Sequence, residues 1–351
     1  MRRIGILGHS DPTSTVRYFE RAAASAGHEF VKMESVDRAS SLNGLDCLIV
    51  VDPFLTDPAV FRSAPCPVVG YLIDVHQQLM PRLAYARYFD HAFIAQLDFL
   101  YAFQALPHPS VHWLPLACDP TLHFTADLKR TYDVGFVGKF GSSESERSRV
   151  LTEVLSKFPT NETRRKYTPQ EMGRVYSSSK IVFNKSINGD LNMRVFEGMA
   201  SGSMLITDRI SNGLDKIGVD GEHYVTYSSS SEAIEKIRYF VENDREREEI
   251  ALRGQSHVLL EHTYQKRLSQ ILGKIDEGGA VRSPARRCSS RTEAVWRSEW
   301  MRLRGASPRE AFNLLVNGHL SQRVLINGAV GLARGLVRSA RQNLSTWSSL
   351  T

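Results

Sequence analysis

Short apolar runs alternate with amphipathic segments along the first 120 residues of this chain. Residues 45–51 (LDCLIVV) and 67–73 (PVVGYLI) are apolar almost without interruption. Strands that are buried on both faces, as in a parallel sheet, have this pattern. Further runs that predict strands occupy residues 3–8, 28–33, 92–95 and 111–114. A helix is expected over residues 15–26, so the first part of the chain predicts a doubly wound parallel sheet.

The same alternation starts again after residue 131. Residues 115–120 (PLACDP) interrupt the rhythm, and a polar segment follows them. Further strands are expected at residues 132–137, 181–183, 204–207 and 223–227. Helices are expected at residues 145–158, 190–202 and 231–242, and helical segments continue to residue 275. We therefore predict an α/β protein with two Rossmann-like domains, residues 1–124 and 130–275, that face each other across a cleft.

The last part of the chain differs in composition. Residues 276–293 are rich in glycine, serine, arginine and proline and have no apolar period, which predicts a linker. Residues 294–351 are expected to form a basic, partly helical tail, with helices at 296–303, 308–316 and 323–344. From residue 281 onward, twelve arginines stand against three glutamates, a net charge of +9. Because the whole chain carries +6, the first 280 residues carry −3, and we expect no nucleic-acid partner.

Two features, the basic tail and the apolar run near the amino terminus, give expectations for the cellular location of the protein. Arginine interleaved with leucine and valine suits an anionic membrane surface. A helix that packs on the acidic body, or a segment without fixed structure, is the alternative interpretation. The apolar run at residues 4–7 is too short for a signal peptide, and no run reaches the ~18 residues of a membrane span. We expect a cytoplasmic protein that contacts the inner face of the membrane if the tail binds there.

The stretch from residue 180 to 208 (KIVFNKSINGDLNMRVFEGMASGSMLITD) combines two short strands with a helix between them. Asp190 is expected to cap this helix and Gly202 to end it. The core row of the helix is Met193, Phe196 and Ala200, and the row beside it is Arg194, Glu197 and Ser201. A helix that follows a strand in an open α/β sheet begins at the crevice where ligands bind. The second row is therefore a candidate site.

This segment carries groups that suit a nucleotide. The segment spans residues 188–197 and begins with Asn188. Asn192 and Arg194 fall in the first turn of its helix. A diphosphate there gains from the helix dipole and from the guanidinium. Glu197, one turn further on, can accept hydrogen bonds from the two hydroxyls of a ribose. The alternative is a simple ion pair between Arg194 and Glu197.

A glycine-rich loop offers a second group of ligands. Gly138 and Lys139 follow a predicted strand and precede a predicted helix. Glycine lets a ligand approach the backbone, and a helix N-terminus attracts anions. The four cysteines, by contrast, are scattered without a C-x-x-C pair, which argues against a zinc site or a disulfide framework. An ordinary tight turn is the alternative interpretation of the glycine loop.

Several segments resemble one enzyme family. RVFEGMASGSMLITD resembles the donor-site segment of the group 1 glycosyltransferases, which have a GT-B fold, and in particular the branch named after the spore-maturation protein CgeB. YDVGFVGKFGSSESERSRVL, YTPQEMGRVYSSSKIVFN and VENDREREEIALRGQSHVLLEHTYQKRLSQIL resemble other parts of the donor domain, and WLPLACDPTLH resembles the segment that closes the acceptor domain. The resemblance is good over residues 132–275, looser over 1–131 and absent beyond 280. One departure concerns Gly189, which stands where retaining members carry the first of two glutamates; the second is Glu197.

The resemblance implies a glycosyltransferase of the hexosyltransferase type. It would move a sugar from a nucleotide-diphosphate sugar to a carbohydrate, lipid-linked or protein acceptor. Gly138, Lys139, Asn192 and Arg194 would hold the diphosphate, and Glu197 the ribose. No Asp-x-Asp motif is present, so we expect no metal and no cofactor. The alternatives are a nucleotide-sugar epimerase or hydrolase of the same fold and a non-catalytic protein that binds a glycan or a partner.

The first predicted domain offers candidates for the chemistry at the acceptor. Asp74 and His76 follow a predicted strand, so either can serve as a general base or orient the donor sugar. A solvated loop is the alternative there, as it is for His9 after the first strand. Asp119 is expected to cap or turn the segment between the domains rather than to react.

Overall fold

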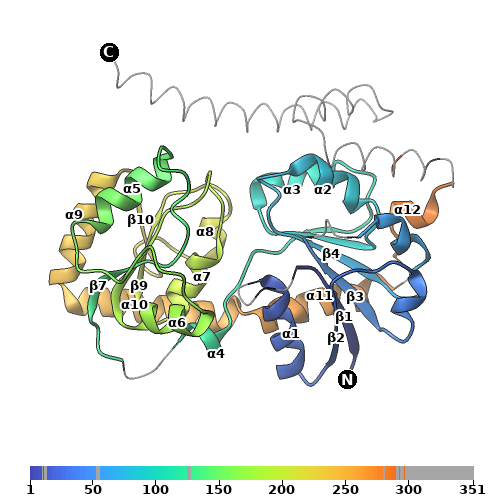
Figure 1. The fold of residues 1–351 in the computed structure, drawn as a ribbon, viewed down its shortest axis with the longest axis horizontal. Coiled ribbons are helices and arrows are strands. Elements are labelled where there is room, and N and C mark those ends of the chain that lie inside the picture. The colour runs from blue at the N-terminus through green and yellow to red at the C-terminus, as the bar shows by residue number, and fades with distance from the viewer. Residues whose placement is uncertain are drawn as a thin grey trace, which may run out of the picture. The chain divides into compact units, whose positions relative to one another are not determined.

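A computed structural model gives the architecture of the chain (Figure 1). It describes residues 1–289 except 10, 12–13, 53–55, 125–127 and 280, together with residues 292 and 296. The helices that we expect within the basic tail lie outside the described residues, residue 296 excepted.

The strands and helices follow the predicted alternation. The strands are β1 (Arg3–Leu7), β2 (Glu29–Met33), β3 (Cys47–Val51), β4 (Val68–Leu72), β5 (His91–Ile94), β6 (Val111–Trp113), β7 (Tyr132–Gly135), β8 (Ser179–Asn184), β9 (Met204–Asp208) and β10 (Val225–Tyr227). The α-helices are α1 (Thr15–Ser25), α2 (Leu79–Ala86), α3 (Leu100–Gln104), α4 (Pro120–His123), α5 (Glu146–Leu155), α6 (Pro169–Ser177), α7 (Met193–Ala200), α8 (Leu214–Ile217), α9 (Ser230–Glu242), α10 (Asp244–Glu261), α11 (Tyr264–Gly278) and α12 (Pro284–Arg287). Three short 3₁₀ helices are η1 (Ala39–Leu42), η2 (Pro58–Ser63) and η3 (Leu97–Phe99).

Six strands form the first sheet, in the order β2-β1-β3-β4-β5-β6. From β1 to β6 the neighbouring strands pair in parallel, with Ile4 opposite Cys47 and Val69 opposite His91. Every residue of β3, β4 and β5 is buried, as expected for strands covered on both faces. The apolar runs at residues 45–51 and 67–73 therefore form the central strands that their pattern predicts.

Four strands form the second sheet, in the order β10-β9-β8-β7, and all three pairs are parallel. One core cluster joins residues of β7, β8, β9 and β10 to residues of α5, α9 and α10. Among its members, Phe183 stacks on Tyr227 at 5.2 Å between ring centroids. Burying such a side chain contributes about 1.5–3 kcal/mol. The predicted α/β class with parallel sheets is confirmed.

The residues divide into two compact units that are not continuous along the chain. One unit contains residues 1–2, 9–32 and 114–274, and so combines α1 with the second sheet. The other contains residues 3–8 and 33–113 and the described residues from 275 onward. The glycine loop and α7 belong to the first of these units.

Residues 281–289, which we expected within a linker, include a helical turn, α12, held by one buried carboxylate. Asp90 is fully buried and accepts hydrogen bonds from the backbone N–H of Val68 and of Ser283, each at 2.8 Å. The guanidinium of Arg286 lies 3.4 Å from the same carboxylate and donates to the carbonyl of Cys66 at 2.9 Å. Composition did not indicate this order because the partners of residues 283 and 286 lie about 200 positions earlier in the chain.

Candidate functional site

The helix α7 begins two residues later than its sequence pattern predicts. Asn192, not Asp190, occupies the N-cap position, and the side chain of Asn192 makes no capping hydrogen bond. Its Oδ1 atom is buried without a hydrogen-bond partner among the described residues. The predicted cap at Asp190 is wrong because this carboxylate instead accepts a hydrogen bond from the backbone N–H of Ile187, within the preceding loop. Gly202, with a φ of 73°, ends the helix as expected.

The loop before α7 has a fixed conformation. Asn188 and Gly189 have φ values of 55° and 78°. Ser186 donates to the buried carboxylate of Asp208 through its backbone N–H at 2.7 Å and its hydroxyl at 2.5 Å. The Ser186 hydroxyl also accepts from the N–H of Gly189 at 3.2 Å. Asp208, at the end of β9, therefore sets the path of the loop that carries the exposed Asn188.

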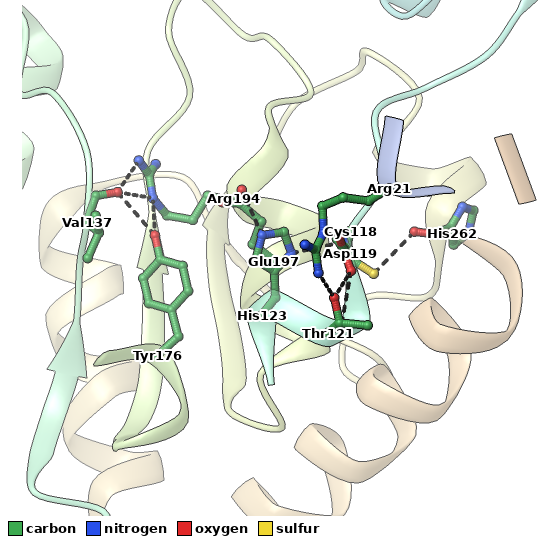
Figure 2. A network of polar contacts seen from close by, with 10 residues as sticks. All are labelled: Arg21, Cys118, Asp119, Thr121, His123, Val137, Tyr176, Arg194, Glu197 and His262. Atoms are coloured by element: carbon green, nitrogen blue, oxygen red, sulfur yellow. Dashed lines mark hydrogen bonds and ion pairs between the residues drawn. The ribbon is translucent and has the colours of Figure 1, made fainter. Parts of the chain in front are cut away.

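Arg194 is turned toward the glycine loop (Figure 2). Its Nε and Nη2 atoms donate to the carbonyl of Val137 at 3.1 and 2.8 Å, and Nη1 donates to Oδ1 of Asn184 at 2.7 Å. The guanidinium also lies over the ring of Phe136, 4.5 Å from its centroid. A guanidinium has five N–H bonds. One on Nη1 and one on Nη2 thus remain without an acceptor in the part of the chain that the structure describes.

Gly138 makes this approach possible. It has a φ of 155°, and a Cβ atom at this position would collide with Nη2 of Arg194. The neighbouring Lys139 is exposed, and its carbonyl accepts from Nε of Arg147 at 3.1 Å. The glycine loop and the first turn of α7 therefore bring Gly138 and Arg194 together, with Lys139 next in the loop. Their roles in holding a diphosphate stay predictions.

Arg147 is a second guanidinium at this loop. It lies on α5 with only 8% of its surface exposed, and Nη1 is buried with no hydrogen-bond partner among the described groups. Burial, and then the nearby charge of Arg194, lowers its pKa to about 10. The sequence shows that a cation is present here, but it does not show that the side chain is buried. The guanidinium lies over the ring of Phe136 and donates to the carbonyl of Lys139, and these contacts form only in the folded chain.

Glu197 lies in a buried position one turn along α7. Only 6% of its surface is exposed, and this burial raises the pKa of the carboxyl to about 7, although Arg194 opposes the rise. The alternative interpretation, a simple ion pair between Arg194 and Glu197, does not describe this helix, since the guanidinium is bound to Val137 and Asn184. The carboxyl instead lies beside His123, with Oε1 3.7 Å from Nε2 (Figure 2).

His123, the last residue of α4, is a site residue that the sequence reasoning did not identify. It is fully buried, and burial lowers its pKa to about 4. Its Nδ1 atom accepts a hydrogen bond from the backbone N–H of Asp119 at 3.1 Å. Asp119 caps α4 by accepting from the N–H of Thr121 at 3.0 Å, as expected of it. The available signal was a histidine four residues after an Asp-Pro pair, which places it one helical turn from the cap.

The contacts of three further predicted residues are different. Ser201 is buried and donates to the carbonyl of Gly198 in its own helix at 2.7 Å. Asp74 and His76 belong to the other compact unit, after β4. There the carbonyl of Asp74 accepts from the N–H of Gln77 at 3.0 Å, and Nδ1 of His76 is buried without a hydrogen-bond partner in the described structure. Their proposed chemical roles stay predictions.

Comparisons with known proteins find one family model and several solved structures that are similar to this chain. Residues 123–273 match the family model described as glycosyl transferase-like. No curated protein is significantly similar to the chain in sequence. Among solved structures, the Anabaena protein HepE in complex with UDP-glucose is similar with a TM-score of 0.61 and 11% identity, over 78% of this chain and 100% of that one.

Two further structures agree. Sucrose-phosphate synthase from Thermosynechococcus elongatus has a TM-score of 0.58 at 11% identity, over 80% of this chain and 100% of that one. A glycosyltransferase from Rickettsia africae has a TM-score of 0.58 at 10% identity, over 80% and 99%. The fold is GT-B.

The described residues include no helix that is long and apolar enough to cross a membrane. They also include no group of three or more His, Cys, Asp or Glu side chains placed to hold a metal ion.

Proposed function

We propose that this chain is a glycosyltransferase that transfers a sugar from a nucleotide-diphosphate sugar to an acceptor. The observation that carries the proposal is the position of Arg194. Its guanidinium is fixed over Phe136 beside Gly138, with an N–H on each terminal nitrogen left over. Such a preorganised cation stabilises the charge that develops on a leaving diphosphate.

The neighbouring groups suit the rest of the donor. The exposed Lys139 adds a second cation, and Glu197 can accept hydrogen bonds from the ribose hydroxyls. The likeness in fold to HepE, which was solved with UDP-glucose, supports a UDP-sugar as the first donor to test. Within the family, we propose a place in the CgeB-like branch, a hexosyltransferase type of transfer, and no requirement for a metal.

The acceptor side extends the proposal. We propose that Asp74 or His76 serves the acceptor or the donor sugar and that the acceptor is a carbohydrate, a lipid-linked sugar or a protein. The basic tail, residues 294–351, would bring the enzyme to an anionic membrane surface. Flotation of the whole protein with vesicles that contain phosphatidylserine tests this last point, and binding only to neutral vesicles would contradict it.

The central test is donor binding followed by turnover. A thermal-shift panel of UDP-, GDP-, ADP- and dTDP-glucose should identify one base, and isothermal titration should then show that Arg194→Ala and Glu197→Ala weaken it. Arg149→Ala is the matched control, because Arg149 is an exposed arginine on α5. Turnover is then measured with and without EDTA. Release of the sugar without any acceptor would identify a hydrolase, and the absence of any shift would favour a binding protein.

A further inference from the structure

The ring of His123 is held in one tautomer by the backbone. The N–H of Asp119 donates to Nδ1 at 3.1 Å, so Nδ1 presents its lone pair. The ring is neutral near pH 7, because burial lowers its pKa to about 4. A neutral imidazole carries one N–H, which must then be on Nε2.

This single N–H is directed at Glu197. Nε2 lies 3.7 Å from Oε1 of Glu197 and makes no hydrogen bond with any described group. A hydrogen bond needs a distance of about 2.7–3.2 Å, so a shift of less than about 1 Å would complete it. Unpaired N–H groups in a buried position are costly. Figure 2 shows the two side chains facing each other, from α4 and α7.

Aromatic packing and ion pairing keep the ring in this place. Tyr18 of α1 meets His123 edge-on at 5.5 Å and stacks on Tyr264 at 5.0 Å. Asp119, which orients the ring through its N–H, is itself bound by Nε of Arg21 at 2.6 Å. All these residues belong to one compact unit. The donor at Nε2 is therefore fixed before any ligand arrives.

We propose that His123 is a positioning residue for Glu197: its Nε2–H holds the ionised carboxylate in the orientation that receives a ligand's hydroxyl hydrogens. The assignment of those hydroxyls to a nucleotide ribose rests on the proposed function. The hydrogen bond between His123 and Glu197 does not. Because the N–H favours the charged form of the carboxyl, it also makes Glu197 a better acceptor at neutral pH.

The other polar groups around Glu197 do not titrate in the same range. They are Arg194 on its own helix, Tyr18 on α1, Tyr176 on α6, and Cys118 before α4. Burial raises the pKa of Tyr176 to about 12 and those of Tyr18 and Cys118 well above their usual values. An arginine guanidinium is not deprotonated in proteins. A change near neutral pH within this group therefore reports on Glu197.

The wild-type protein gives the first test, without nucleotide. Nitrogen-15 NMR of the His123 ring should find the proton on Nε2, and its resonance should move downfield as Glu197 ionises between pH 6 and 8.5. The Glu197→Gln variant should abolish this movement. A proton on Nδ1, or a ring resonance that ignores the ionisation of Glu197, would overturn the proposal.

A matched pair of variants separates positioning from packing. In His123→Asn the amide lies near the place of Nδ1 and cannot reach Glu197, whereas in His123→Gln an amide N–H lies near the place of Nε2. The Asn variant should raise the pH at which Glu197 titrates and weaken UDP binding at pH 7.5 by about tenfold, and the Gln variant should stay within about threefold of wild type. A packing role alone would lower the melting temperature of both variants and leave the titration of Glu197 unmoved. If that titration moves while Glu197→Gln binds UDP like wild type, the positioning role stands and the ribose assignment fails.

Discussion

The guanidinium of Arg194 occupies the space that a side chain at Gly138 would need. Arg194 is 56 residues away from Gly138 in the sequence, so the two residues come into contact only in the folded chain. The same guanidinium donates to the carbonyl of Val137. These hydrogen bonds fix the position of the Arg194 charge relative to the backbone of the glycine loop.

The first prediction concerns Gly138→Ala. The added Cβ should displace Nη2 of Arg194, and UDP-glucose binding, measured by isothermal titration, should weaken by about tenfold or more because charged hydrogen bonds are lost. Gly141→Ala is the control, as Gly141 has a φ of 89° in the same loop but approaches Ser145 rather than Arg194. Equal loss of affinity in the two variants would assign the effect to loop strain.

The second prediction concerns Arg194→Lys. Lysine keeps the charge but cannot bind the Val137 carbonyl and Asn184 at once while it presents two further N–H bonds. We expect kcat to fall by about 100-fold, as for other lost donors to a developing anion. Arg149→Lys, on the exposed face of α5, should leave kcat unchanged. Wild-type turnover in Arg194→Lys would mean that only charge matters here.

The third prediction concerns stability and Glu197. Its folded-state pKa of about 7 lies above the ordinary 4.5, so the folded state holds this proton longer than the unfolded state. The contribution of Glu197 to the free energy of unfolding should therefore fall as the pH rises from about 4.5 to about 7. Glu197→Gln removes that loss. Between pH 5 and pH 8, the free energy of unfolding of the variant should therefore rise relative to that of the wild type by up to about 3 kcal/mol, measured by urea denaturation. Glu153→Gln, an exposed glutamate on α5, should show no such pH-dependent gain.

The same ionisation should govern ligand affinity. A carboxylate accepts two hydroxyl hydrogens, whereas a protonated carboxyl must itself donate one. UDP-glucose, whose diphosphate does not titrate in this range, should therefore bind more tightly as the pH rises through about 7 in the wild type and with constant affinity in Glu197→Gln. Isothermal titration at pH 6, 7 and 8 measures this, and a wild-type affinity that is independent of pH would argue against contact between Glu197 and the ribose.

The fourth prediction compares two truncations. Deleting residues 281–351 removes the N–H of Ser283 and the guanidinium of Arg286 from the buried Asp90, whereas deleting residues 290–351 keeps both. The longer deletion should be less stable than the shorter one by about 1–3 kcal/mol in urea denaturation, since a buried carboxylate loses donors. Equal stability would show that the contacts at Asp90 contribute nothing.

Much of the architecture could be predicted from the sequence, because buried parallel strands leave apolar runs such as residues 45–51. Regular spacing also placed Arg194 and Glu197 on neighbouring turns of one helix. The roles within the site depend on contacts that no local pattern encodes. The carbonyl of Val137 orients the side chain of Arg194. Burial raises the pKa of Glu197, and the backbone N–H of Asp119 selects the tautomer of His123. The shift of the helix cap from Asp190 to Asn192 has the same cause, since Asp190 is committed to the preceding loop.

The bond between Arg21 and Asp119 has a consequence for recombining this protein with its relatives. Arg21 lies on α1, near the start of the chain, yet it belongs to the same compact unit as α4 and α7. A chimera joined at residue 124 would combine a foreign α1 with the native Glu197. Grafts that exchange the amino-terminal part of the chain should therefore retain residues 15–25 and 114–123 of the recipient, so that the ring of His123 keeps both its aromatic neighbour and its backbone donor.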